Sequence, residues 1–210
     1  DQLMNERTFS EELGVSRMPL REAFSALSLM GILDAQQGSG TYIKQYDPEA
    51  LGRLMTIYSV LDDISLDDLF EVRAVLESQM ARLATMRCTP ENLRKMEESL
   101  AEGHVFLEKC KNAPSSKEAT MQKFFQLNSF HNAIAAAAQN RYLLQLMDAF
   151  RMMSAQFFER SSGDPLQNVM TAMEEHTAVF EAIRDQRADE AAARMYAHLI
   201  HEAQGLKNAM

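Results

Sequence analysis

The sequence has no tryptophan, only two cysteines among its 210 residues, and no uninterrupted apolar run of the about 20 residues that a membrane span needs. Cys88 and Cys110 stand in neither a CxxC nor a Cys/His metal spacing, so we interpret them as reduced thiols of a cytoplasmic protein. Residues 1–12 carry four acidic side chains and no apolar block. We therefore expect no signal peptide and no membrane association.

Positive charge is also scarce, because 21 Lys and Arg residues face 30 Asp and Glu residues and the formal net charge is −9. Taken alone, this balance argues against a nucleic-acid-binding protein. The acidic excess, however, comes largely from residues 62–103, whereas residues 1–45 carry three arginines and a lysine at defined places. Since a DNA-binding head needs only local positive charge, the composition remains compatible with one.

The first 45 residues predict two short helices followed by a β-hairpin. Thr8 is a typical N-cap for the first helix, and Gly14 is suited to the left-handed conformation that ends it. Ser16 would cap a second helix, with Pro19 in its first turn and an end near residue 30. Residues 32–43 are two apolar segments around a glycine-rich turn, the pattern of a hairpin. Helix, turn, helix and hairpin in this order indicate a winged helix-turn-helix.

In a helix-turn-helix, the second helix lies in the major groove with its N-terminal residues at the bases. This rule places Ser16, Arg17, Pro19 and Arg21 at the predicted DNA surface. Arg17 and Arg21 are one turn apart and share a face. A guanidinium group can bind guanine O6 and N7, or a phosphate, through two parallel hydrogen bonds. We therefore expect these two arginines to bind double-stranded operator DNA.

Further signals lie on both sides of this helix. Arg7 precedes it and can contact phosphate or base, and the hairpin turn with Gln37 and Gly38 can reach the adjacent minor groove. The segments that carry a family resemblance are Glu6-Arg7, Glu11 through Ala23, Gly31-Ile32-Leu33 and Gln37 through Ile43. They resemble the DNA-binding domain of the GntR family, which implies operator contacts by Arg7, Arg17, Arg21 and the turn. That family usually has a helix before Glu6, and we expect the head to lack it here.

After residue 46 the strand signals disappear, and helix caps with apolar periodicity predict about seven helices. Their expected starts lie near residues 48, 65, 89, 118, 141, 165 and 188. The 15 methionines lie mostly on these helices, and we interpret them as flexible core filling. The predicted fold is therefore mainly α. A winged helix-turn-helix with a small β-hairpin (residues 1–45) precedes an all-α bundle (residues 46–210).

Three histidines are candidate metal ligands. His131, His176 and His198 each lie within a different predicted helix and are flanked by apolar residues that should face the core. Inward imidazoles on three helices of a bundle can converge on one point, and imidazole is a good ligand for Zn²⁺ or Ni²⁺. For one such histidine a purely structural role would be the better interpretation, so the metal hypothesis depends on their convergence.

A second resemblance supplies that convergence. The segments that carry it are Leu69 through Glu77, Phe130-His131 with Ala133-Ile134-Ala135 and Asn140, His176 with Ile183, and Met195 with His198-Leu199. They resemble the FCD domain of the FadR subfamily within the GntR family. The resemblance implies a divalent transition metal held by one Asp and three His, with the histidines at positions 131, 176 and 198.

The sequence departs from that family pattern one turn before the first histidine, where Leu127 replaces the Asp. Asn128 is the neighbouring residue that offers a carbonyl oxygen to a metal or an effector. Arg73 lies within a mainly apolar helix, with Glu77 one turn on. Either the two form a supporting pair or Arg73 binds an effector carboxylate, and the family resemblance favours the effector.

These observations predict a homodimeric, sequence-specific transcription regulator and not an enzyme. A small carboxylate effector, bound in the helical domain at a three-histidine metal site, would modulate operator binding. The same type of regulator with a metal-free pocket is the alternative. A three-histidine metal-dependent hydrolase is a further alternative, but the histidine motifs lack the accompanying acid of HExxH and the hydrolase leaves the head unexplained.

Overall fold

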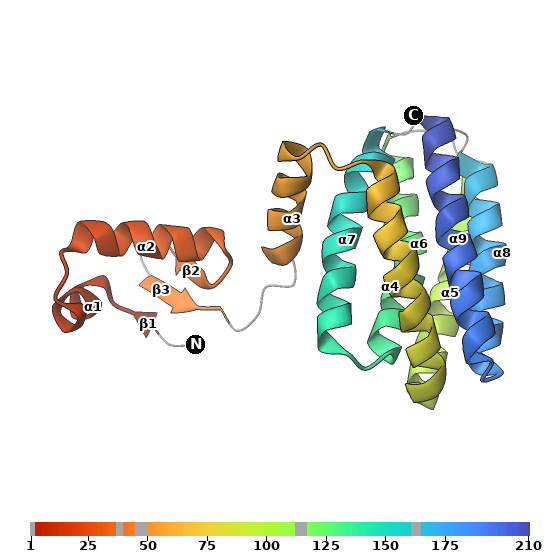
Figure 1. Cartoon of the computed structure of the whole chain (residues 1–210), viewed down its shortest axis with the longest axis horizontal. Helices are drawn as coiled ribbons and strands as arrows, with labels where there is room; N and C mark the ends of the chain where they lie inside the picture. The colour runs from red at the N-terminus through yellow and green to blue at the C-terminus, as the bar shows by residue number, and fades with distance from the viewer. Residues whose placement is uncertain (1–2, 37–39, 45–49, 112–116, 161–164) are drawn as a thin grey trace.

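The computed structural model describes residues 3–36, 40–44, 50–111, 117–160 and 165–210. It confirms a mainly α fold with a small antiparallel sheet near the N-terminus (Figure 1). The N-terminal elements are β1 (Leu3–Met4), α1 (Glu6–Leu13), α2 (Arg17–Leu29), β2 (Leu33–Gln36) and β3 (Gly40–Ile43). The helices that follow are α3 (Ala50–Leu61), α4 (Leu66–Arg87), α5 (Pro90–Cys110), α6 (Lys117–Ala137), α7 (Arg141–Arg160), α8 (Pro165–Arg184) and α9 (Ala188–Ala209).

The N-terminal helices pack on a sheet whose strand order is β1-β3-β2. The hairpin of β2 and β3 was predicted, with Leu33 opposite Ile43, but β1 was not, because two residues are too few to show a pattern. The predicted N-cap at Thr8 is wrong. Asn5 caps α1 instead, since its Oδ1 accepts hydrogen bonds from the backbone N–H groups of Arg7 and Thr8.

The turn and the second helix of this head agree with the prediction. Gly14 ends α1 in the left-handed conformation with φ 65°, and Ser16 precedes α2 with an extended backbone. Leu20 and Phe24 are one turn apart on α2 and are buried against Leu33 of β2. Arg17, Met18 and Pro19 at the start of α2 are exposed, whereas Leu20 in the same turn points into this small core. The fold therefore leaves that turn open to a partner.

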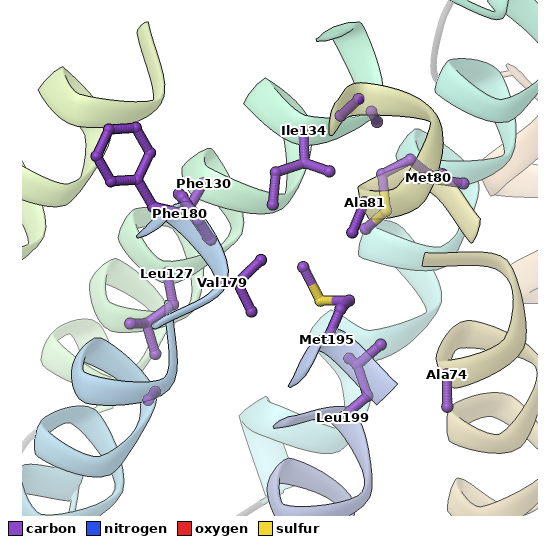
Figure 2. Packing of buried hydrophobic residues seen from close by; sticks show 14 of the residues in the cluster. Ala74, Met80, Ala81, Leu127, Phe130, Ile134, Val179, Phe180, Met195 and Leu199 are labelled. Atoms are coloured by element: carbon purple, nitrogen blue, oxygen red, sulfur yellow. The ribbon is translucent and has the colours of Figure 1, made fainter. Parts of the chain in front are cut away.

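The remaining seven helices in the described part of the chain form the bundle that the sequence predicts. Capping fixes where several of them begin. Ser65 and Asp68 form a reciprocal capping box at the start of α4, and Thr89 and Asn92 form another before α5. Apolar side chains of α4, α6, α8 and α9 meet in the core, and Figure 2 shows Leu127, Phe130, Val179 and Leu199 among them.

Helix α3 packs along α7. Gly52 permits close contact, because a Cβ atom at this position would lie 2.5 Å from Sδ of Met152 and 3.2 Å from Cα of Ala149. Among the described residues, no helix is both long enough and apolar enough to cross a membrane. The bundle surrounds a compact buried polar cluster, described next.

Candidate metal and effector site

The three predicted histidines meet inside the bundle. His131 on α6, His176 on α8 and His198 on α9 are 3%, 1% and 2% exposed. Their Nε2 atoms form a nearly regular triangle, with separations of 3.0 Å (His131–His176), 3.1 Å (His176–His198) and 3.2 Å (His131–His198). The expected convergence of three imidazoles is thus present, and each ring presents the same nitrogen to the centre.

Two of these rings are fixed from behind by carboxylates. Nδ1 of His131 lies 2.6 Å from Oε2 of Glu77, and Nδ1 of His198 lies 2.7 Å from Oε2 of Glu175. A carboxylate accepts a hydrogen bond, so it keeps the proton on Nδ1 and leaves the Nε2 lone pair facing the centre. The outer contacts therefore select the tautomer that a metal ion requires.

His176 differs from the other two histidines because no carboxylate of the described residues contacts its outer nitrogen. Its Nδ1 has no hydrogen-bond partner among the described residues, and its ring stacks on Phe130 with 4.7 Å between centroids. Its pKa lies well below the ordinary value because complete burial disfavours the charged form, and the other two histidines and Arg73 add repulsion. His176 is therefore neutral at pH 7 and can act as a ligand without first losing a proton.

The triangle has the dimensions of a three-imidazole metal site. Nitrogens bound at about 2.0–2.1 Å to one ion, in tetrahedral or octahedral arrangement, lie about 2.8–3.4 Å apart. The observed separations of 3.0–3.2 Å fall within this range. Among the described residues, His131, His176 and His198 form a group whose ligand atoms lie close enough together to share one ion. The residues present fit a divalent transition metal.

A buried ion pair continues the network behind His131. Nε of Arg73 lies 2.7 Å from Oε1 of Glu77, and Nη1 donates a 3.1 Å hydrogen bond to Ser154 of α7. Burial alone would raise the pKa of the Glu77 carboxyl, but Arg73 and His131 outweigh it and lower the pKa to about 2. Arg73 is completely buried and Glu77 is 2% exposed. The Arg73–Glu77 pair that the sequence suggested is therefore present.

Arg73 also has a hydrogen-bond donor that the described residues leave unused. Its Nη2 is buried and has no hydrogen-bond partner within the described part of the chain, and its Nη1 lies 3.7 Å from Oε2 of Glu202. Pairing with Glu77 thus leaves one edge of the guanidinium group available. This geometry is compatible with both roles expected for Arg73, the partner of Glu77 and a group that binds an effector carboxylate.

A cavity of about 110 Å³ lies beside His198. Its lining has both apolar and polar side chains and comprises Leu127, Phe158, Thr171, Ala172, Glu175, His198, His201, Glu202, Gly205 and Leu206. Leu127 is one turn before His131 on α6 and is 8% exposed, whereas Asn128 is 1% exposed and does not line the cavity. The apolar side chain at position 127 therefore forms part of the wall next to the histidines.

Sequence reasoning missed three polar residues of this wall. Glu175 bridges the buried His198 and the exposed His201, whose Nδ1 lies 2.6 Å from Oε1 of the same carboxylate. Hydrogen bonds from both histidines lower the pKa of Glu175, although partial burial acts against them. Glu202 follows His198 by one helical turn. That spacing, and the adjacency of Glu175 to His176, were the available signals.

The predicted DNA-contact residues lie at the surface of the head. Arg17 and Pro19 are exposed in the first turn of α2, and Ser16 makes no side-chain capping hydrogen bond. Arg7 pairs with Glu11 at 3.2 Å, and Arg21 pairs with Glu6 at 2.8 Å. The predicted wing residues Gln37 and Gly38 lie outside the described residues. Unlike Arg7 and Arg21, Arg17 forms no ion pair with another of the described residues.

Two family models match the chain. The model of bacterial regulatory proteins of the gntR family matches residues 1–43, and the FCD domain model matches residues 68–201, more than half of the chain. The chain belongs to the GntR family. It is a member of the FadR-like subfamily, in which a winged helix-turn-helix precedes an FCD domain.

Curated GntR-family relatives extend over nearly the whole chain. The HTH-type transcriptional regulator LutR of Bacillus subtilis (strain 168) is 28% identical over 95% of this chain and 88% of its own length. The Uxu operon regulator of Haemophilus influenzae is 29% identical over 95% of this chain and 71% of its own length. These relatives are transcriptional regulators, so this GntR protein is a DNA-binding transcription regulator and not the hydrolase held as an alternative.

A solved structure shows the same fold. Streptococcus agalactiae GntR superposes with a TM-score of 0.66 at 23% sequence identity, covering 97% of this chain and 89% of that chain. The fold of nearly the whole chain is thus shared with that structure.

Proposed function

We propose that this GntR-family regulator binds its operator as a homodimer and responds to a small organic acid bound beside a Zn²⁺ or Ni²⁺ ion in the FCD domain. His131, His176 and His198 would hold the ion. The observation that carries the proposal is the triangle of Nε2 atoms, each 3.0–3.2 Å from the other two, with carboxylates behind two of the rings. When bound, the ion supplies positive charge that an acid can coordinate.

The local charge balance favours this proposal over a metal-free pocket. Three carboxylates, Glu77, Glu175 and Glu202, lie around the histidines and the cavity, and the guanidinium group of Arg73 pairs with Glu77 and Glu202. These three carboxylates and one guanidinium group sum to two negative charges in a poorly solvated region. Such a region attracts a divalent cation and repels an organic anion. A bound divalent ion would balance the charge and permit the anion to enter.

The head would supply operator recognition. We propose that residues 1–45 form the DNA-binding domain and residues 46–210 the effector and dimerisation domain, in a cytoplasmic protein. Arg7, Ser16, Arg17, Pro19 and Arg21, with Gln37 and Gly38 of the wing, would contact double-stranded DNA. The exposed first turn of α2 supports this assignment.

Dimerisation would place two heads on two half-sites of one operator. Exposed apolar side chains on α3, with Ile57, Tyr58 and Leu61 at 51%, 67% and 76% exposure, provide a surface that a second copy can cover. Light scattering of the full chain should give twice the monomer mass of 23.8 kDa. A monomer at micromolar concentration would contradict this part of the proposal.

Elemental analysis of the purified full chain, before and after chelation, tests the metal site. We expect close to one equivalent of zinc or nickel, and a melting temperature that falls when the ion is removed, because an ion bound to the native state stabilises it. His176→Ala should lose the ion, whereas the matched control His104→Ala, at an exposed position on α5, should retain it. An unchanged metal content in His176→Ala would show that the ion lies elsewhere.

A further inference from the structure

Met18 presents an apolar side chain to solvent in the first turn of α2. It is 72% exposed and stands between the exposed residues Arg17 and Pro19. With 3.6 residues per turn, it lies about 160° around the helix axis from Leu20, which is buried in the small core of the head. The side chain of Met18 therefore points away from the fold, at the end of α2 that is proposed to meet DNA.

The outward line of α2, the side that points away from the core, carries no positive charge. Four exposed residues follow one another on it at intervals of three or four: Met18, Glu22, Ser25 and Leu29. Arg17 and Arg21 lie to one side of this line, where a helix in the major groove faces the phosphates of the groove wall. Phosphates repel the carboxylate of Glu22. The outward line is therefore better suited to base edges than to the DNA backbone.

We propose that Met18 reads the C5-methyl group of a thymine in each operator half-site. This inference rests on the proposed placement of α2 in the major groove. In that groove the base edges present hydrogen-bond donors and acceptors, and thymine adds a methyl group that an apolar side chain can contact. A thioether placed on the polar edges would remove water from them without replacing its hydrogen bonds. Met18 therefore favours one base over the other three.

The shape of the methionine side chain suits this contact. The major groove is about 8.5 Å deep, so a long side chain on the outward line reaches the bases more readily than a short one. Methionine is unbranched and has three rotatable bonds, and its terminal methyl group can adapt to an apolar neighbour. Burial of this group against thymine would also remove an exposed apolar surface from water.

Operator duplexes that lack single methyl groups test the proposal. The full chain first selects a duplex from a randomised library. Each thymine of that duplex is then replaced in turn by deoxyuridine, which lacks the C5-methyl group and keeps the base pairing. We expect one thymine in each half-site whose replacement weakens binding about fourfold, as the burial of one methyl group implies. Fluorescence anisotropy measures each affinity.

Variants assign the methyl contact to one side chain. Met18→Ala should bring the ratio of thymine to deoxyuridine affinity at that position close to one, whereas Met18→Leu, which stays apolar, should keep a higher ratio. Leu29→Ala is the matched control, because Leu29 is 73% exposed on the same line but about 16 Å further along the helix. It should keep the wild-type ratio. Since Met18 is uncharged, Met18→Ala should also keep the wild-type dependence of affinity on salt.

Adding a methyl group tests the same contact in the opposite sense. A cytosine paired with guanine in place of the identified thymine should weaken binding of the wild type. 5-Methylcytosine at the same position carries a methyl group at the corresponding place in the major groove, and it should restore about fourfold of the lost affinity. In Met18→Ala, cytosine and 5-methylcytosine should bind equally.

The outcomes separate this inference from the proposed operator contact. If Arg17→Ala weakens operator binding but no deoxyuridine does, Met18 does not read a methyl group and the placement of α2 stands. A deoxyuridine effect that persists in Met18→Ala assigns the methyl contact to another side chain and also overturns the proposal. If neither Arg17→Ala nor Met18→Ala changes binding, or if the chain selects no sequence, the placement of α2 and this inference fail together.

Discussion

The carboxylate of Glu77 lies between a guanidinium group and an imidazole, with its Oε2 2.6 Å from Nδ1 of His131. Both Glu77 and His131 are almost completely buried, and the second oxygen of Glu77 is 2.7 Å from Nε of Arg73. One side chain therefore both neutralises a buried cation and orients a proposed metal ligand. These two roles can be separated by experiment.

Glu77→Gln should destabilise the chelator-treated chain by about 3–5 kcal/mol at pH 7, because Arg73 would remain buried without its counter-charge. The folded-state pKa of Glu77, about 2, lies below its ordinary value of 4.5. The ion pair therefore stabilises the fold fully above about pH 4.5 and loses its effect as the pH falls towards 2. Urea unfolding across this range measures the free energy of unfolding, and the difference between wild type and variant should shrink as the pH falls.

The control for this prediction is Glu181→Gln, at an exposed position on α8, which should change the free energy of unfolding by about 0.5 kcal/mol or less. If the difference in free energy of unfolding between wild type and Glu77→Gln stays constant down to low pH, the destabilisation comes from lost packing and not from lost charge.

Glu175→Gln should weaken zinc binding about 10- to 100-fold without removing any proposed ligand. The amide can still accept from Nδ1 of His198, but it cannot supply the negative charge that raises the basicity of the imidazole. Competition with a chromophoric chelator measures the dissociation constant. The exposed neighbour Glu174 provides the matched control, since Glu174→Gln should leave the constant unchanged. Equal effects of both variants would rule out a specific role for Glu175.

Leu127→Asp should increase the dependence of stability on metal. An Asp one turn before His131 would add an oxygen ligand near the histidines, and zinc should bind at least about tenfold more tightly. Without the ion the same carboxylate would be buried in an apolar wall, because Leu127 is 8% exposed, and the chain should melt at a lower temperature. The melting temperatures with and without chelator should therefore differ more than in the wild type. Leu127→Asn should give smaller changes in zinc affinity and in the melting temperature without the ion.

Arg17→Ala should weaken operator binding by about 1–3 kcal/mol if the side chain reads a base. Fluorescence anisotropy with a duplex selected from a randomised library measures the affinity, and Arg94→Ala, in the exposed part of α5, is the control. An equal loss for selected and random duplexes would show that Arg17 contacts phosphate only. Unchanged affinity for both would remove Arg17 from the interface.

The helical part of the fold could be predicted closely because its signals are local. Thr89 before Pro90, and Ser65 three residues before Asp68, fix helix starts through hydrogen bonds within one turn. The start of α1 was misplaced because Asn5 and Thr8 are both good caps, and the sequence does not show which side chain reaches two free N–H groups. The strand β1 depends on pairing with β3, a contact that no local pattern encodes.

The histidines of the site were found from apolar neighbours and a family resemblance, whereas the carboxylates around them were missed. Glu175 and Glu202 read as ordinary helix-surface residues, since each has charged or polar neighbours in the sequence. Their role depends on the rotation of α8 and α9 against each other. That rotation is set by packing between helices in the core, to which Val179 of α8 and Leu199 of α9 contribute, and no local pattern in the sequence encodes it.

The glycine contact between α3 and α7 gives the bundle a mechanical property. Because Gly52 has no side chain, the backbone of α3 packs directly against the backbone of α7 at Ala149. Five residues further along α7, Ser154 receives the hydrogen bond of Arg73. A change at the buried ion pair that displaces α7 would therefore also press on α3, the first bundle helix after the head.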